Sequence, residues 1–302
     1  MSSGYRCVCC HSVQLQFSET KATCDVCKTE YLVEAGAPVF LHPSNSLFNK
    51  STIGCHSSTG FRGGFIARVG KILPDLTFNR LQDFALEQYI DNLPKSSRCL
   101  VIGAGFDVLL LKKLEDSGHC VIGTDVILTP KTTCVCDGHD LPFSDQFFDS
   151  VIGIAVLEHV INPGQVVSEI YRVLKIGGTV FSALPFLQQV HMGKYDFQRF
   201  TLLGHRWLFK KFKVLDINRT AGAGSSLLWG ISGFFQSFTA NKKIDLLVKA
   251  AIRVLFFWVK YFDLLHPKTT NDFVLGTYLI AEKEAGYHLD KHTLLTLYSE
   301  KK

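Results

Sequence analysis

The sequence of 302 residues contains no charged low-complexity run and no internal repeat, and its net charge is only +5. A charge this small gives no reason to expect nucleic acid as a partner. The first residues, MSSGYRC, lack the apolar core of a signal peptide, and the ten cysteines are not arranged like a secreted disulfide framework. We therefore expect a cytoplasmic, reduced protein with one large core and a small accessory module.

Two C-x-x-C pairs lie near the N-terminus, separated by thirteen residues: Cys7, Cys10, Cys24 and Cys27. Four thiolates at this spacing predict a zinc ribbon over residues 1–45, in which Cys9 could in principle replace Cys10. The run YLVEAGAPVF at positions 31–40 makes the module similar to the zinc-ribbon domain of the tRNA-methyltransferase activator family. A ribbon this small binds or braces and supplies no chemistry itself.

The run RCLVIGAGFD, residues 98–107, predicts a buried strand that enters a tight glycine turn and then a helix. Glycine in this turn lets the backbone pass close beneath a ligand, and the free N–H groups of the following helix favour negative charge. Asp125 ends a second apolar strand twenty residues after Gly105, where an acid suits a pair of ribose hydroxyls. Val108 occupies the position of the third glycine of a dinucleotide fingerprint, which disfavours a nicotinamide dehydrogenase.

Strands and helices alternate from residue 98 onward, after a connector and leading helix (46–97) whose helical part covers 77–93. This alternation predicts a doubly wound α/β sheet, in which ligands bind beyond the carboxyl ends of the strands. The predicted strands cover 99–102, 119–124, 132–136, 149–155, 178–184, 213–218 and 273–282. The predicted helices that follow the glycine turn cover 106–117, 141–147, 163–174 and 201–211.

Four motifs between residues 136 and 186 occur in the order found in class I S-adenosylmethionine-dependent methyltransferases. They are DGHDLPF at 137–143, FDSV at 148–151, LEH at 157–159 and RVLKIGG at 172–178. The chain therefore resembles this family, in particular its type 11 members, and the resemblance implies a seven-stranded Rossmann-like sheet over residues 98–285. Val101 stands where the family usually has an acid, and Asp107 where it usually has a glycine.

The resemblance also implies a cofactor, S-adenosyl-L-methionine, and the residues that hold it. The glycine turn would approach the methionine portion, Asp125 the ribose hydroxyls, and Asp137 with the Gly138 backbone the adenine. A helix cap over 139–145 is the alternative role for Asp137. The implied cofactor-binding residues are Gly103, Ala104, Gly105, Asp125, Val126, Asp137, Gly138 and Ala155.

Polar side chains that follow strands 149–155 and 178–184 are the candidates for catalysis. His159 could accept a proton from the acceptor, or it could be a packing or capping histidine. The loop HMGKYDFQRFT resembles a segment of methyltransferases from glycan and natural-product clusters. Its acid and arginine could instead pair with each other while Thr201 caps a helix. The predicted catalytic residues are His159, His191, Asp196 and Arg199.

Residues 220–272 form a longer segment than the hairpin expected before the last strand, and they predict a helical insertion. Its helix 244–265 places Asp245, Lys249, Arg253 and Lys260 near one face, which forms a narrow basic stripe on an otherwise largely aliphatic and aromatic surface. Such a helix fits a membrane interface, and it also fits a lid or dimer helix buried by protein. Residues 286–302 predict a loose or weakly helical tail.

We therefore predict a methyltransferase with a zinc ribbon that methylates oxygen of a small-molecule, glycan or lipid-linked acceptor, including secondary metabolites. Peripheral contact with the cytoplasmic face of a membrane would occur through residues 244–265. One alternative is an RNA methyltransferase that uses the ribbon for RNA recognition, which the modest charge disfavours. The other is a non-catalytic scaffold, against which the cofactor-binding pattern argues.

Overall fold

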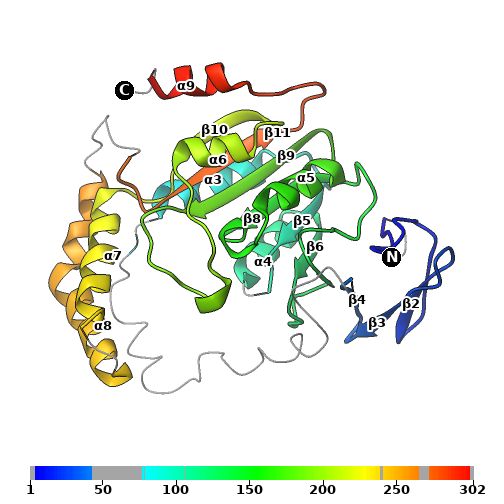
Figure 1. Cartoon of the computed structure of the whole chain (residues 1–302), viewed down its shortest axis with the longest axis horizontal. Coiled ribbons are helices and arrows are strands. Elements are labelled where there is room, and N and C mark those ends of the chain that lie inside the picture. The colour runs from blue at the N-terminus through cyan, green and yellow to red at the C-terminus, as the bar shows by residue number, and fades with distance from the viewer. Residues whose placement is uncertain are drawn as a thin grey trace.

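The structure is a computed structural model of the chain, and it describes residues 4–42, 77, 79–105, 107–238, 241–264 and 272–299. Residues 46–76 of the predicted connector lie outside the described residues. A β-sheet forms the centre of the molecule, the N-terminal module lies at one end, and helices α7 (Ala223–Gln236) and α8 (Lys242–Phe256) lie at the other (Figure 1). The candidate site residues must therefore be located relative to this sheet.

The described part of the chain forms an eleven-stranded sheet of order β1-β2-β3-β4-β7-β6-β5-β8-β9-β11-β10. Strands β7, β6, β5, β8 and β9 are parallel neighbours, whereas β11 is antiparallel to both β9 and β10. The expected count of seven differs because four strands of the N-terminal module extend the sheet. The other seven are β5 (Arg98–Ile102), β6 (Cys120–Asp125), β7 (Cys134–Cys136), β8 (Phe148–Ile154), β9 (Leu174–Pro185), β10 (Lys213–Arg219) and β11 (Gly276–Glu282).

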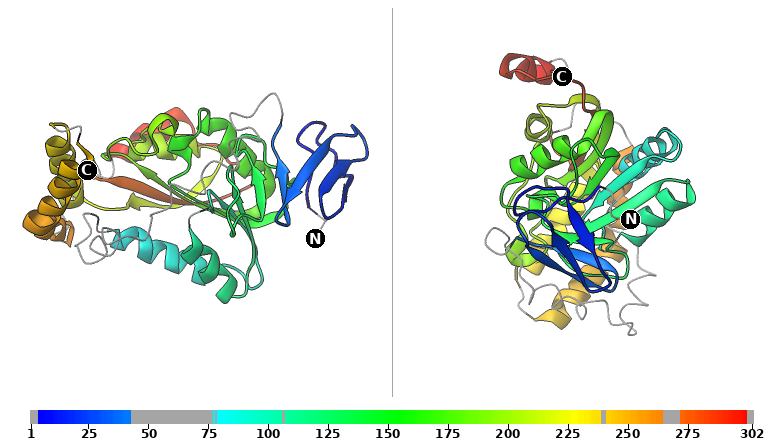
Figure 2. Two further views of the ribbon diagram at one scale, coloured as in Figure 1. Left: turned by 90° about the horizontal axis from the view of Figure 1, so that it is seen from below. Right: turned by 90° about the vertical axis from the view of Figure 1, so that its right-hand side faces the viewer.

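Helices cover both faces of the sheet (Figure 2). Alternate residues of β5 pack on opposite sides, because side chains along a strand alternate in direction. Val101 belongs to the core formed with α3 (Arg80–Asp91) and α4 (Val108–Asp116), whereas Leu100 belongs to the core formed with α5 (Pro163–Val173). Helix α6 (Leu202–Leu208) lies beside β10 and β11. The predicted α/β class is confirmed.

The N-terminal module is a small antiparallel set of strands, β1 (Leu15–Phe17), β2 (Lys21–Cys24), β3 (Glu30–Glu34) and β4 (Ala37–Phe40). Strand β4 pairs in parallel with β7, with Val39 opposite Val135. The ring of Tyr5 stacks on Phe40 with centroids 5.4 Å apart, and both rings join the large hydrophobic core. The module is therefore packed against the sheet as well as hydrogen-bonded to its edge.

The helix predicted over residues 141–147 does not form, and that prediction is wrong. Leu141 and Phe143 are fully buried, and Tyr5 pairs with Phe143 in an isolated antiparallel bridge. The backbone N–H of Arg6 donates to the carbonyl of Pro142 over 3.0 Å, and Ser144 N–H donates to the Gly4 carbonyl over 2.8 Å. The backbone groups that a helix would need are thus occupied by the N-terminal module.

The helix predicted over 244–265 is divided between α8 and a 3-10 helix, η3 (Phe257–Leu264). The carboxylate of Asp263 accepts hydrogen bonds from the backbone N–H groups of Gly224 (2.7 Å) and Ser225 (3.2 Å) at the start of α7. This tertiary contact satisfies two free N–H groups of α7 and holds the last turns of the insertion against it. The predicted basic stripe is also corrected, because Lys260 is buried.

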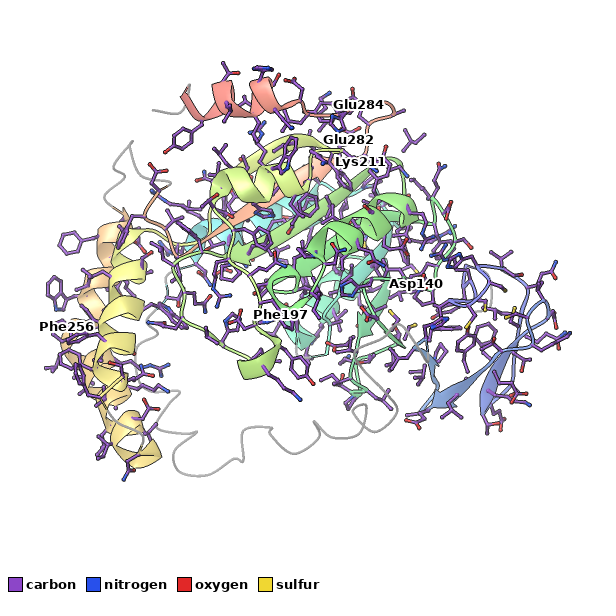
Figure 3. All side chains as sticks on the ribbon, in the orientation of Figure 1. Asp140, Phe197, Lys211, Phe256, Glu282 and Glu284 are labelled. Carbon is purple, nitrogen blue, oxygen red and sulfur yellow. The ribbon has the colours of Figure 1, made fainter. Side chains whose placement is uncertain are left out.

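The tail contains α9 (Lys291–Ser299) above α6 in Figure 1, which agrees with the weakly helical prediction. Within the described residues, none of the helices combines the length and the apolar character needed to cross a membrane. The outer surface of the insertion nevertheless exposes many large apolar side chains, among them Phe234, Leu247, Leu255 and Trp258. In Figure 3, Phe256 lies at this outer edge, far from Asp140 beside the N-terminal module.

Candidate active site at the carboxyl ends of the parallel strands

The glycine turn follows β5 at the centre of the parallel strands, where strand order reverses between β5 and β8. Gly103 has a φ of +74°, which glycine adopts without strain. The Gly105 N–H donates to Asp125 Oδ2 over 2.9 Å, and a Cβ at position 105 would lie 2.7 Å from that oxygen. Asp107, at the position where the family usually has a glycine, instead accepts from the Leu110 N–H and caps α4.

Asp125 joins the ends of β5 and β6. Besides Gly105, its carboxylate accepts from the N–H of Ile127 over 3.1 Å. The side chain is therefore held by backbone groups of two turns, while the buried Ala104 lies beneath the first of them. Val126 follows, half-buried, beside the same carboxyl ends. The turn and the acid predicted to hold a cofactor are adjacent, as their spacing indicated.

Asp137 and Gly138 follow β7 at the same edge. Asp137 accepts from the N–H of His139 over 3.0 Å, and its Oδ1 lies 2.6 Å from His139 Nδ1. The N–H of Asn162 donates to His139 Nε2 over 3.2 Å, so the ring proton of the neutral histidine belongs on Nδ1. The alternative in which Asp137 caps a helix over 139–145 is wrong, since it caps a turn at His139.

Ala155 lies just past β8 with a φ of +52°, and its N–H donates to the Ala183 carbonyl over 2.9 Å. The next residue, Val156, approaches Gly103 so closely that a Cβ at 103 would lie 2.7 Å from its Cγ2. Ala155 is exposed at this edge of the sheet. The chain after β8 and the glycine turn after β5 are therefore side by side.

Two predicted catalytic histidines lie close to a fully buried carboxylate, Glu158, in the 3-10 helix η1 (Leu157–His159). Oε1 of Glu158 lies 3.7 Å from Nε2 of His159 and 3.7 Å from Nε2 of His191. The two imidazole rings meet edge to face with centroids 4.7 Å apart. The carboxylate of Glu158, with a further contribution from Asp196, raises the pKa of His191.

The other two predicted catalytic residues, Asp196 and Arg199, form an ion pair, which the sequence analysis left open as an alternative. Arg199 Nη2 donates to Asp196 Oδ2 over 2.6 Å, and the guanidinium also donates to the carbonyls of Gln188 and Gln189. Arg199 lowers the pKa of Asp196 to about 2. The pair fixes the loop after β9, and Thr201 caps α6 by accepting from the Gly204 N–H.

The four predicted metal ligands converge in the N-terminal module. One ligand atom from each of Cys7, Cys10, Cys24 and Cys27 lies within 4.8 Å of every other. The Sγ atoms of Cys7 and Cys27, and those of Cys10 and Cys24, are 3.5 Å apart. Sulfur atoms about 2.3 Å from one tetrahedral ion would have separations of this order, so the arrangement fits a metal. Cys10 rather than Cys9 is the member of the cluster.

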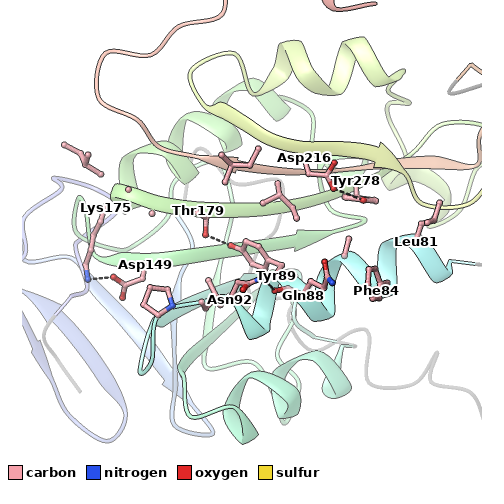
Figure 4. Close-up of a pocket in the computed structure, with 18 residues that line it drawn as sticks. Leu81, Phe84, Gln88, Tyr89, Asn92, Asp149, Lys175, Thr179, Asp216 and Tyr278 are labelled. Carbon is pink, nitrogen blue, oxygen red and sulfur yellow. Dashed lines mark hydrogen bonds and ion pairs between the residues drawn. The ribbon is translucent and has the colours of Figure 1, made fainter. Parts of the chain in front are cut away.

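A cavity of about 720 Å³ lies elsewhere, between α3 and the sheet (Figure 4). It is lined by residues near the amino ends of β8 and β9, including Asp149 and Thr179. Tyr89 hydrogen-bonds there with Ser150 Oγ (2.7 Å) and Thr179 Oγ1 (2.9 Å). Because the glycine turn and the histidines lie at the opposite, carboxyl ends of these strands, this cavity is separate from the candidate site.

Sequence reasoning missed three residues of the site region, Glu158, His139 and Arg6. Glu158 belongs to the LEH motif and His139 to the DGHDLPF motif, but the motifs alone indicated no role for either side chain. Arg6 carried no signal, because its partners Asp140 and Glu169 are more than 130 positions away.

Part of the chain matches known proteins. Residues 100–182 match the family model described as a methyltransferase domain. The ubiquinone/menaquinone biosynthesis C-methyltransferase UbiE of Geotalea daltonii is 31% identical over 103 residues, which make up 34% of this chain and 34% of that protein. The chain thus matches about a third of the length of this curated relative.

Two of the similar solved structures are methyltransferases. Phosphoethanolamine N-methyltransferase 2 of Haemonchus contortus, in complex with S-adenosyl-L-methionine, has 17% identity and a TM-score of 0.46, covering 68% of this chain and 52% of its own. The 1,6-didemethyltoxoflavin-N1-methyltransferase of Burkholderia thailandensis has 14% identity and a TM-score of 0.43. The match covers 68% of this chain and 77% of that protein. Residues 100–182 are thus similar to a methyltransferase domain.

Proposed function

We propose that this chain transfers a methyl group from S-adenosyl-L-methionine to an oxygen atom of a small-molecule, glycan or lipid-linked acceptor. The observation that carries the proposal is the position of the Gly103–Gly105 turn and Asp125 beside the Glu158–His159–His191 cluster. One group of residues suits an adenosine-like cofactor, and the other suits a polar acceptor with a proton to lose. Both groups lie at the carboxyl ends of adjacent parallel strands.

In this proposal the cofactor supplies an activated methyl group on a sulfonium. The chain provides alignment, exclusion of water and a proton acceptor. Gly103 and Gly105 would admit the methionine portion, Asp125 would bind the ribose hydroxyls, and Asp137 would meet the adenine. His159 Nδ1 lies 2.9 Å from the Tyr195 carbonyl, which fixes the proton on Nδ1 and leaves Nε2 to accept a proton.

The proposal is tested first by calorimetric titration of the full chain with S-adenosyl-L-methionine. Asp125→Asn should weaken binding by roughly 1–3 kcal/mol, because the amide replaces a carboxylate in a charge-assisted hydrogen bond. Asp216→Asn, on the distant strand β10, is the matched control. Absence of binding to folded wild-type protein would overturn the proposal. The acceptor class is then sought by comparing labelled-methyl incorporation in cells with and without the protein.

We also propose that the cysteine cluster holds one zinc ion, which would brace the N-terminal module. The ligands are soft thiolates at tetrahedral spacing, which supports zinc over a harder cation. Metal analysis of protein purified without chelator should find zinc bound to the chain. Replacement of Cys24 by Ser should lower the zinc content by one equivalent, and an unchanged content would contradict this assignment.

A lipid surface is the partner that we propose for the outer face of the insertion. Exposed aliphatic side chains such as Leu247 and Leu255 lie there together with Trp258 and Tyr261, which suit an interface between water and lipid. The wild-type chain should float with anionic vesicles, and Leu247→Glu with Leu255→Glu should abolish flotation without weakening cofactor binding. A wild-type chain that never floats would contradict membrane contact and favour a soluble acceptor.

A further inference from the structure

Glu158 is a buried acid without a hydrogen-bonding partner in the described part of the chain. Its side chain has no exposed surface, and neither carboxylate oxygen accepts a hydrogen bond from a described residue. An ionised carboxylate in such a position is strongly unfavourable unless a positive charge lies beside it. The side chain is aimed at His159 and His191, whose Nε2 atoms are each 3.7 Å from its Oε1. The cluster therefore requires a cation or added protons.

The hydrogen bonds of the two imidazoles favour a cation. His159 Nδ1 lies 2.9 Å from the carbonyl of Tyr195, an atom that can only accept, so the ring proton belongs on Nδ1. His191 Nδ1 is 3.4 Å from the carbonyl of Gln189 and 3.4 Å from Asp196 Oδ2, two further acceptors. Histidines that bind metals usually donate the other ring N–H to a carbonyl or carboxylate in this way. In the neutral form of each ring, the Nε2 lone pair is thus directed toward the carboxylate of Glu158.

The distances also suit a single ion. Ligand atoms of Glu158, His159 and His191 all lie within 4.8 Å of one another. Two ligands bound about 2.0–2.2 Å from one metal are about 3–4 Å apart, which includes the observed 3.7 Å. The histidine side chains remain 18% and 31% exposed, so the buried ligand lies on one side and solvent on the other. Two histidines and one carboxylate leave coordination positions open for an exogenous ligand.

We propose that Glu158, His159 and His191 bind a divalent transition-metal ion, which would take an oxygen of the acceptor as a further ligand. The ion would then orient the acceptor and lower the pKa of its hydroxyl, whose proton would leave to solvent. With the ion bound, His159 Nε2 would be a metal ligand and not the proton acceptor. The metal assignment rests on ligand geometry and is independent of cofactor binding, so either proposal can fail without the other.

Cobalt(II) is the probe that separates this site from the cysteine cluster. The full chain, carrying one equivalent of zinc on the four thiolates, is titrated with Co²⁺ and followed by absorption spectroscopy. We expect one additional equivalent with weak visible bands and without the intense thiolate charge-transfer band of a cysteine site. Absence of Co²⁺ uptake, or uptake accompanied only by the thiolate band, would overturn the proposal.

Variants locate the bound ion. Glu158→Gln keeps the shape of the side chain and removes its charge, and it should weaken Co²⁺ binding roughly 100-fold or more. His191→Gln, at a partly exposed position, should act similarly and serves if the first variant does not fold. Glu284→Gln and His292→Gln, a carboxylate and an imidazole at the surface, should leave the affinity unchanged. Equal affinity in Glu158→Gln, His191→Gln and wild type would refute the site.

Discussion

The side chain of Arg6 connects the N-terminal module to the loop that carries Asp137. Its Nη2 lies 2.9 Å from Asp140 Oδ1 and 3.1 Å from Glu169 Oε2, and its Nε donates to the Leu141 carbonyl over 3.3 Å. Its side chain is only 10% exposed. We expect Arg6→Ala both to destabilise the fold and to weaken cofactor binding.

The size of the effect follows from the partners left behind. Glu169 keeps two hydrogen bonds from Arg172 and one from the Leu141 N–H, so the loss falls mainly on Asp140. A hydrogen bond to a charged group contributes about 1.5–3 kcal/mol when buried, and partial exposure of Asp140 reduces this. The bonds to Asp140 and Glu169 would together contribute about 3–6 kcal/mol if fully buried. The exposure of Asp140 and the remaining partners of Glu169 reduce this, so we expect Arg6→Ala to lower the free energy of unfolding by about 2–4 kcal/mol.

Urea unfolding followed by circular dichroism measures this change, and calorimetry measures the cofactor affinity. Lys21→Ala is the matched control, because Lys21 pairs with Glu30 at the exposed surface of the same module and contributes about 0–1 kcal/mol. Arg6→Lys should recover only part of the loss, since one ammonium lacks the fork that reaches three acceptors. If Arg6→Ala is no more destabilising than Lys21→Ala, the module does not brace this loop.

Three further predictions concern other parts of the chain. Chelation of zinc should remove hydrogen-exchange protection from β1–β3 while β5 and β8 stay protected; loss throughout would contradict this. Gly105→Ala places a Cβ against Asp125 and should abolish measurable cofactor binding by calorimetry, whereas Gly230→Ala, in open space, should bind normally. Burial lowers the pKa of His205 to about 3 in the folded chain, below the ordinary value that this histidine has in the unfolded chain. Between these two values the unfolded chain binds a proton on His205 that the folded chain does not. Stability should be full above about pH 6.5 and fall as pH drops toward 3, by about 1.4 kcal/mol per unit. Urea unfolding across this range should show a smaller slope of the free energy of unfolding against pH in His205→Gln than in wild type. An equal slope in the two proteins would contradict the prediction.

The parts of the fold that could be predicted are those that depend on a local sequence pattern. Strand β5 and the glycine turn follow from an apolar run that ends at glycines, of which Gly103 has a positive φ, and α5 follows from its apolar spacing. The helix over 141–147 failed because a short segment with two buried apolar side chains can equally be a loop. Its conformation is decided by residues 4–6, which no local pattern connects to it.

The insertion shows the same limit. Its apolar composition and its helical character could be predicted, but the change from α8 to η3 depends on Asp263 reaching the start of α7. The burial of Lys260 likewise depends on how η3 packs. Periodicity alone placed that lysine on the same stripe as Lys249, which in the folded chain pairs with Asp245 over 2.8 Å.

In the candidate site, too, the residue types could be predicted from the sequence but their tertiary contacts could not. The loop after β9 is tied to η1 because the Phe197 N–H donates to the Glu158 carbonyl over 2.9 Å and the His191 N–H donates to Asp196 Oδ2 over 2.7 Å. Asp196 and Arg199 therefore hold His191 in place, whereas His159 and His191 face the buried acid. All four residues were predicted to be catalytic, because a sequence shows residue types but not the directions in which side chains point. Only the folded structure distinguishes the side chains that hold the loop, Asp196 and Arg199, from those that face Glu158. No sequence pattern marks Glu158 as buried.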